Sequence, residues 1–202
     1  MVDKVRKPRE QGPSVLPVLE QLFACYPALF GADFLPLKLG IFHEILAQHP
    51  DKFDKESLKA ALGVHTRSTR YLQSVAAGAM RHDLSGVAVE PLAPEHIYLA
   101  IMELHRRRQG RSKVDLKPQL LTQLTAAFEA SGLSREEYAA LVHVNLAEAE
   151  VPLCEAFAAL DAVLAKDTAL LRAFQQSGKS IEAFTDMYGL QQADVQRALA
   201  RA

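Results

Sequence analysis

A group of basic side chains in the first half of the chain has the spacing of a phosphate-binding surface. Lys55 and Lys59 are four residues apart, so a helix would place both on one face. Arg67, Arg70 and Tyr71 follow closely in the sequence. An arginine can grip a phosphate with two hydrogen bonds, and a tyrosine ring can stack on a base or a ribose. These residue types together indicate a nucleic-acid surface.

Hydroxyl side chains beside these arginines favour the same chemistry. Thr66, Ser68 and Thr69 stand where a helix is expected to begin. The first N–H groups of a helix have no partner within it, and the helix dipole favours an anion there. Two simpler interpretations stay open at this point. Charges at helical spacing are typical of an ordinary solvated face, and Tyr71 is equally compatible with a partly buried aromatic residue.

No pattern in the sequence indicates catalysis, a metal or a cofactor. The chain has no glycine-rich phosphate loop, no G-x-S-x-G elbow and no H-E-x-x-H motif. Its seven histidines are dispersed, and His43 and His49 would lie on different helix faces. Cys25 and Cys154 are far apart within apolar helical patterns, so we expect buried, reduced thiols. We therefore expect a binding protein and not an enzyme.

Charge is distributed unevenly along the chain. Residues 1–113 carry 16 basic and 12 acidic side chains, whereas residues 114–202 carry 7 basic and 12 acidic ones. A basic half joined to an acidic half is expected when one domain meets a polyanion and the other has a different role. The sequence has neither a signal-peptide pattern nor the run of about 20 apolar residues that a membrane span requires. A cytoplasmic location with no membrane partner is the expectation.

Apolar periodicity predicts the elements that position the basic residues. Helices are predicted at about residues 14–26, 36–49, 55–62 and 66–77, the second opened by Pro36 and the third stopped by Gly63. The Ser85-Gly86 turn signal, flanked by short strand-like stretches, predicts a β-hairpin. Pro94 then opens a helix that ends in three consecutive arginines.

The second half is predicted to be entirely helical. Ser134 and Glu137 form a capping box, and Pro152 is expected to open a new helix. The expected helices lie at about residues 116–130, 134–151, 152–166, 167–176, 180–188 and 191–200. The last two have the rhythm of a helix-turn-helix, but the segment has few cations for a DNA reader. Two packed amphipathic helices are the favoured interpretation.

Three motifs in the first half resemble the ProQ/FinO domain over residues 14–108. They are Pro36-Leu37-Lys38-Leu39-Gly40-Ile41-Phe42, Leu62-x-x-x-Thr66-x-Ser68-x-Arg70-Tyr71-Leu72 and Gly78-Ala79-Met80-Arg81-His82-Asp83-Leu84-Ser85-Gly86. Their order and spacing are specific. The chain departs from the family pattern at Gly63, where a basic residue is frequent, at His65, where tyrosine is common, and at Thr69, where some members have tryptophan.

The resemblance implies a mostly α fold with a small hairpin, and an RNA chaperone as the function. Such bacterial domains bind the base of a terminator hairpin and its single-stranded 3′ tail, stabilise small RNAs and assist their pairing with messenger RNA. The partners implied are small RNAs and messenger RNA 3′ ends with terminator hairpins. Transferred by position, the RNA contacts fall on Lys38, Lys55, Lys59, Arg70, Tyr71 and Arg81, beside the helix-start hydroxyls of Thr66, Ser68 and Thr69. Charge and proximity add Lys52 and Arg67.

These expectations divide the chain into four parts. Residues 1–13 form a flexible basic arm, 14–108 the RNA-binding domain, 109–115 a linker and 116–202 an acidic helical domain of unknown role. Self-association or a protein partner is the expected use of that last domain. The alternatives left open are a DNA-binding regulator that uses the tail helices and a protein adaptor whose basic residues are merely solvated. Asp83 is expected either to fix the hairpin through backbone amides or to orient Arg81.

Overall fold

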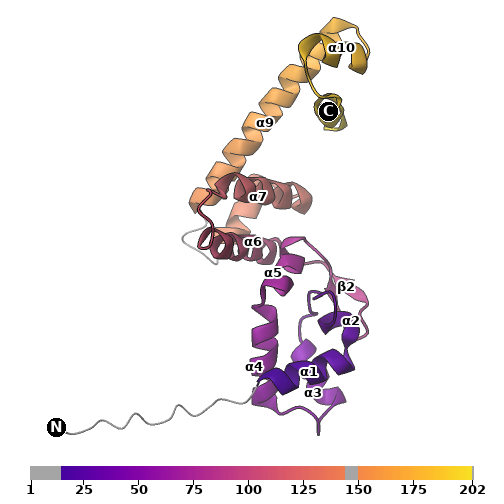
Figure 1. Cartoon of the computed structure of the whole chain (residues 1–202), viewed down its shortest axis with the longest axis vertical. Helices are drawn as coiled ribbons and strands as arrows, with labels where there is room; N and C mark the ends of the chain where they lie inside the picture. Colours follow the sequence, from indigo (N-terminus) through magenta and orange to yellow (C-terminus); the bar gives the residue numbers. More distant parts are fainter. Residues whose placement is uncertain (1–14, 144–149, 202) are drawn as a thin grey trace, which may run out of the picture. The chain divides into compact units, whose positions relative to one another are not determined.

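The chain divides into two units, Met1–Leu116 and Lys117–Ala202, in a computed structural model that describes residues 15–143 and 150–201 (Figure 1). The arm predicted at residues 1–13 therefore lies outside the described residues. Among its described residues, the first unit contains six helices and one two-stranded antiparallel sheet. Its elements are α1 (Val15–Cys25), α2 (Pro27–Phe30), α3 (Ile41–Gln48), α4 (Lys55–Thr66), α5 (Thr69–Ala76), β1 (Arg81–His82), β2 (Ala88–Glu90) and α6 (Pro94–Gln109). The predicted mostly α fold with a small hairpin is confirmed.

The stretch that begins at Pro36 was predicted as the first turn of a helix, and this is wrong. His82 N donates to Pro36 O at 2.7 Å and Lys38 N donates to His82 O at 2.9 Å, so the stretch pairs in parallel with β1. The helix α3 begins only after Gly40, whose φ of 83° is left-handed. Glycine adopts that conformation without steric cost, and it turns the chain from the strand-like segment into the helix.

Helix α4 passes through Gly63 and ends at Thr66, so the predicted stop at Gly63 is also wrong. A glycine inside a helix costs roughly 1 kcal/mol relative to alanine, which the packing of the buried Leu58 and Leu62 can outweigh. Helix α5 then starts at Thr69 and not at Thr66, because Ser68 is its N-cap and accepts the backbone N–H of Tyr71.

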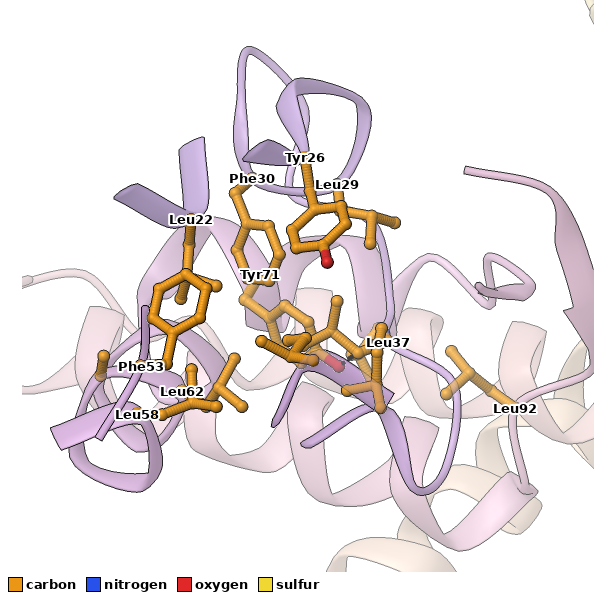
Figure 2. Packing of buried hydrophobic residues seen from close by; sticks show 14 of the residues in the cluster. Leu22, Tyr26, Leu29, Phe30, Leu37, Phe53, Leu58, Leu62, Tyr71 and Leu92 are labelled. Carbon is orange, nitrogen blue, oxygen red and sulfur yellow. Dashed lines mark hydrogen bonds between the residues drawn. The ribbon is translucent and has the colours of Figure 1, made fainter. Parts of the chain in front are cut away.

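The core of the first unit lies between α1, α4 and the segments that cross them (Figure 2). Leucine and aromatic side chains fill it, including Leu22, Phe30 and Leu58, each with no exposed surface. Figure 2 shows Tyr71 inside this cluster, with its hydroxyl directed at Leu37. Because α4 and α5 both contribute to the core, the junction between them is held firmly in place.

The second unit is all-helical among its described residues, as predicted. Its elements are α7 (Lys117–Ser131), α8 (Arg135–His143), α9 (Glu150–Ser177), α10 (Ile181–Tyr188) and α11 (Gln192–Ala200). The predicted capping box is confirmed, because Ser134 N donates to Glu137 Oε2 at 3.0 Å and Glu137 N donates to Ser134 Oγ at 3.2 Å. Helices α7, α10 and α11 each pack against α9, the long orange helix of Figure 1.

The break predicted between Lys166 and Asp167 does not exist, since α9 is one continuous helix. Asp167 caused the error: it occupies the inward stripe of the helix and is buried, so the apolar pattern is interrupted there. Arg197 and Arg201 of the tail approach its carboxylate at 3.7 and 3.2 Å. Two cations of the tail are thus ion-paired within the unit, as expected of packed helices.

Cys154 is exposed and Cys25 only partly buried, so the prediction of two buried thiols is wrong. No described helix has the length and apolarity needed to cross a membrane. Within residues 15–143 and 150–201, no cluster of three histidine, cysteine or acidic side chains has a geometry suited to a metal ion.

Candidate nucleic-acid interface

The first turns of α4 expose two of the predicted cations. Asp54 caps the helix by accepting the N–H of Ser57 at 2.9 Å, which fixes the helix start directly before Lys55. Lys55 and Lys59 are both exposed, and their spacing of four residues places them on one side of the helix. No carboxylate among the described residues pairs with either ammonium group. Both charges therefore remain available for an external anion.

The α4–α5 junction presents hydroxyl groups, though not all of them are free. Thr66 Oγ1 donates to the backbone carbonyl four residues earlier at 2.9 Å, so its proton is already used. Ser68 Oγ accepts the N–H of Tyr71 at 3.2 Å, and Thr69 Oγ1 accepts from Arg107 Nη1 at 3.3 Å. Ser68 and Thr69 act only as acceptors in these bonds, so their O–H groups remain free to donate to a phosphate.

Two exposed arginines flank this junction. Arg67 is the C-cap residue of α4, and its backbone carbonyl accepts a hydrogen bond from Arg107 Nη1 at 2.9 Å. The Arg70 guanidinium lies 4.6 Å from the ring centroid of Phe34 and donates to the carbonyl of Ala32. Stacking on Phe34 holds the guanidinium in one orientation and leaves its other N–H groups exposed.

Tyr71 and Arg81 are buried and hold the backbone of Leu37 from two sides. The Tyr71 side chain is 7% exposed, and its hydroxyl accepts the Leu37 N–H at 3.0 Å. Arg81 is 9% exposed, and its Nη1 donates to the Leu37 carbonyl at 2.8 Å. Burial raises the pKa of the Tyr71 phenol. A ring this covered leaves little surface for a base, which favours the alternative of a partly buried aromatic residue over the predicted stacking role.

Replacing Tyr71 with phenylalanine tests this structural assignment. The Tyr71→Phe variant leaves the buried Leu37 N–H without its acceptor, so we expect the free energy of unfolding to fall by about 1–3 kcal/mol. Urea denaturation of both proteins measures the change. RNA affinity at a temperature where both are folded should stay within a few-fold of the wild type, and a large loss there would restore a direct contact for the hydroxyl.

A pocket of about 420 Å³ opens beside the junction, between α5 and α6. Its polar lining comes from Thr66, Tyr71, Arg81, His96 and Glu103, and Leu72, Val75, Leu92, Leu99 and Ala100 supply apolar walls. Arg81 Nη2 lies 3.2 Å from His96 Nδ1 within this lining. The predicted residues Thr66, Tyr71 and Arg81 therefore converge on one hollow, which adjoins the exposed cations of the junction.

Lys38 and Lys52 are engaged by neighbouring side chains. Lys38 Nζ contacts Glu44 Oε1 at 2.6 Å, and this hydrogen bond raises the pKa of the lysine. Lys52 is exposed in the loop before α4 and donates to Cys25 Sγ at 2.9 Å.

Asp83 Oδ1 accepts the N–H groups of Ser85 and Val87 at 2.9 and 3.0 Å, so its predicted role in fixing the hairpin is confirmed.

Sequence reasoning missed the contribution of the last turn of α6. Arg107 reaches the α4–α5 junction and bonds to both Arg67 and Thr69. The three consecutive arginines were a visible signal at the end of a predicted helix. No local pattern indicates that this end returns to the junction, 40 residues earlier in the chain.

A small helical domain that exposes cations and hydroxyls around one helix start has the features of a nucleic-acid-binding domain. Residues 13–117, a little over half of the chain, match the model of the ProQ/FINO family. The chain belongs to the ProQ/FinO family, and the resemblance of the three motifs is confirmed.

Several curated relatives carry the name RNA chaperone ProQ. The one from Shewanella frigidimarina is 37% identical over 108 residues, which cover 52% of each chain. The one from Idiomarina loihiensis is 44% identical over 66 residues, 32% of each chain. The chain thus matches about half the length of its curated relatives or less. A FinO-like RNA chaperone from Neisseria meningitidis is a similar solved structure, with 28% identity, coverage of 43% of this chain and 88% of that one, and a TM-score of 0.39.

Proposed function

We propose that this protein is an RNA chaperone whose first unit binds structured RNA in the cytoplasm. Membership of the ProQ/FinO family carries the proposal, and the exposed Lys55, Lys59, Arg67 and Arg70 around the α4–α5 junction support it. The preferred ligand is a terminator-like hairpin with a single-stranded 3′ tail, as in small RNAs and messenger RNA 3′ ends. Binding would protect such RNAs and assist their pairing.

The physical basis is recognition of shape and charge. An A-form duplex hides the edges of its bases in a deep, narrow groove, so a protein that meets it contacts mainly phosphates and ribose hydroxyls. The ammonium groups of α4 and the free hydroxyls of Ser68 and Thr69 suit phosphates, and the helix start adds a favourable dipole. We propose that the unpaired 3′ end enters the hollow lined by Arg81 and His96. A continuous duplex has no free end to place there.

Equilibrium binding of the full chain tests the function. The ligands are a hairpin RNA with a 3′ uridine tail, the same hairpin with a blocked 3′ hydroxyl, and a DNA duplex of equal charge. We expect the tailed hairpin to bind at least about tenfold more tightly than the DNA, and blocking to weaken it. Preference for DNA would favour the DNA-binding alternative, and no binding to any of the three at moderate salt would favour the protein adaptor.

A shortened chain tests the division of labour between the units. A protein ending at Leu116 keeps the whole core of the first unit, so we expect it to fold and to retain most of the RNA affinity. Circular dichroism checks the fold and fluorescence anisotropy the affinity. Binding by residues 117–202 alone, with none by residues 1–116, would reverse the assignment. Protein contacts or self-association remain the proposed use of the second unit.

A further inference from the structure

The C-terminal end of α6 carries a second concentration of positive charge, distinct from the residues predicted from sequence. Arg106, Arg108, Arg111 and Lys113 are exposed, and Arg107 is partly covered. Favourable interaction with the helix dipole accounts for cations in the last turn. It does not account for Arg111 and Lys113, because α6 ends at Gln109. Five cations within eight residues exceed what capping the helix requires.

The segment that follows α6 is held against the end of the helix by hydrogen bonds. The Gln109 side chain donates to the carbonyl of Val114 at 3.1 Å and accepts the N–H of Leu116 at 2.8 Å. The residues predicted as a linker therefore fold back against the end of α6. Through Arg107, the same end is bonded to the α4–α5 junction. The cations of α6 consequently extend the junction surface.

One carboxylate neutralises part of this charge. Glu103 Oε2 accepts from Arg106 Nε at 2.7 Å, and its Oε1 accepts from Arg106 Nη2 and from Arg107 Nε, each at 2.7 Å. These hydrogen bonds lower the pKa of Glu103 to about 2, so the carboxylate is ionised at neutral pH. Arg108, Arg111 and Lys113 have no such partner among the described residues.

We infer that the end of α6 is a second contact for RNA phosphates and that Glu103 limits its strength by occupying Arg106 and Arg107. The inference rests on the proposed RNA-binding function and extends it. A phosphate approaching these arginines meets donors that are already bonded to a carboxylate, and it is repelled by that carboxylate. Removing the negative charge should therefore strengthen RNA binding, an effect opposite to that of most substitutions at a binding surface.

The Glu103→Gln variant tests this inference in the full chain. Glutamine is nearly isosteric and its Oε1 still accepts a hydrogen bond, so Arg107 can keep its contacts with the junction. With the tailed hairpin RNA, we expect affinity about fivefold higher at 0.1 M salt and a steeper dependence on salt concentration. The matched control is Glu95→Gln, which changes net charge equally in the first turn of the same helix. Its affinity should change less than twofold.

Arginine variants identify the groups involved. Arg108→Gln should weaken binding about threefold and flatten the log–log salt slope by roughly 0.7–0.9, as one lost phosphate contact does. Arg106→Gln should have little effect alone, yet remove much of the gain produced by Glu103→Gln. Equal or lower affinity of Glu103→Gln, or a gain no greater than that of Glu95→Gln, would overturn the inference. Absence of RNA binding by the wild type would instead overturn the proposed function.

Discussion

Replacing Lys55, Lys59 and Arg67 together with glutamine is expected to weaken binding of the tailed hairpin RNA roughly 100-fold at 0.1 M salt. Each of the three is exposed on α4 or at its end, and a net contribution of about 1 kcal/mol for each phosphate contact gives a total of about 3 kcal/mol. The log–log salt slope should fall by roughly 2–3 at the same time. Fluorescence anisotropy over a series of salt concentrations measures both quantities.

The matched control removes three exposed cations from the second unit. Lys166, Arg172 and Lys179 have no ion-pair partner among the described residues, and their replacement changes the net charge by the same amount. We expect this variant to bind RNA within about threefold of the wild type, because the proposed RNA surface belongs to the first unit alone. Equal losses in the two triple variants would mean that binding follows net charge and not the α4 surface.

The second large effect is a loss of stability in acid, caused by His65. This side chain is 2% exposed, and its Nε2 has no hydrogen-bond partner within the described part of the chain. It is surrounded by the rings of Phe30, Phe34 and Tyr71, at centroid distances of 4.6, 4.5 and 5.3 Å. Burial lowers the pKa of His65 from 6.5 to about 4.

The direction of the pH effect follows from proton binding. In the unfolded chain His65 binds a proton as the pH falls through 6.5, whereas in the folded protein it binds one only near pH 4. Acid therefore favours the unfolded chain. The contribution of neutral His65 to the free energy of unfolding is complete above pH 6.5. As the pH falls to 4, the free energy of unfolding decreases by up to about 3 kcal/mol. Urea denaturation at intervals between pH 7.5 and 4 measures this slope.

The His65→Phe variant should remove that part of the pH dependence and be at least as stable as the wild type at pH 7. Phenylalanine fits the surrounding rings and has no unsatisfied nitrogen. The exposed His43 provides the control, and His43→Gln should follow the wild-type curve. Identical pH profiles for His65→Phe and the wild type would show that the histidine is not the source of the acid sensitivity.

Secondary-structure elements were predicted correctly where a residue acts on its own backbone or on a close neighbour in the sequence. The proline at the start of α6, the capping box before α8 and the Ser85-Gly86 turn each act through their own backbone or a neighbour three residues away. The errors arose where distant partners override a local preference. Gly63 does not stop α4, because the helix continues to pack into the core, and the segment before Gly40 is extended because β1 lies beside it.

The residue types of the candidate site could be predicted from the sequence, but the burial of their side chains could not. The sequence identified the cations around the α4–α5 junction, yet it could not show that Tyr71 and Arg81 turn inward to hold Leu37. Hydrophobic periodicity does not separate a buried tyrosine from an exposed one. The contribution of Arg107 was equally hidden, since only the tertiary fold brings the end of α6 to a helix junction 40 residues earlier.

Photocrosslinking of the full chain to a hairpin RNA that carries 4-thiouridine in its 3′ tail and stem tests the central claim most directly. Mass spectrometry of the digested complex identifies the attached peptides. The account predicts crosslinks within residues 38–81, around the α4–α5 junction, and within residues 96–113 of α6 and the segment after it. Crosslinks confined to residues 117–201 would contradict it.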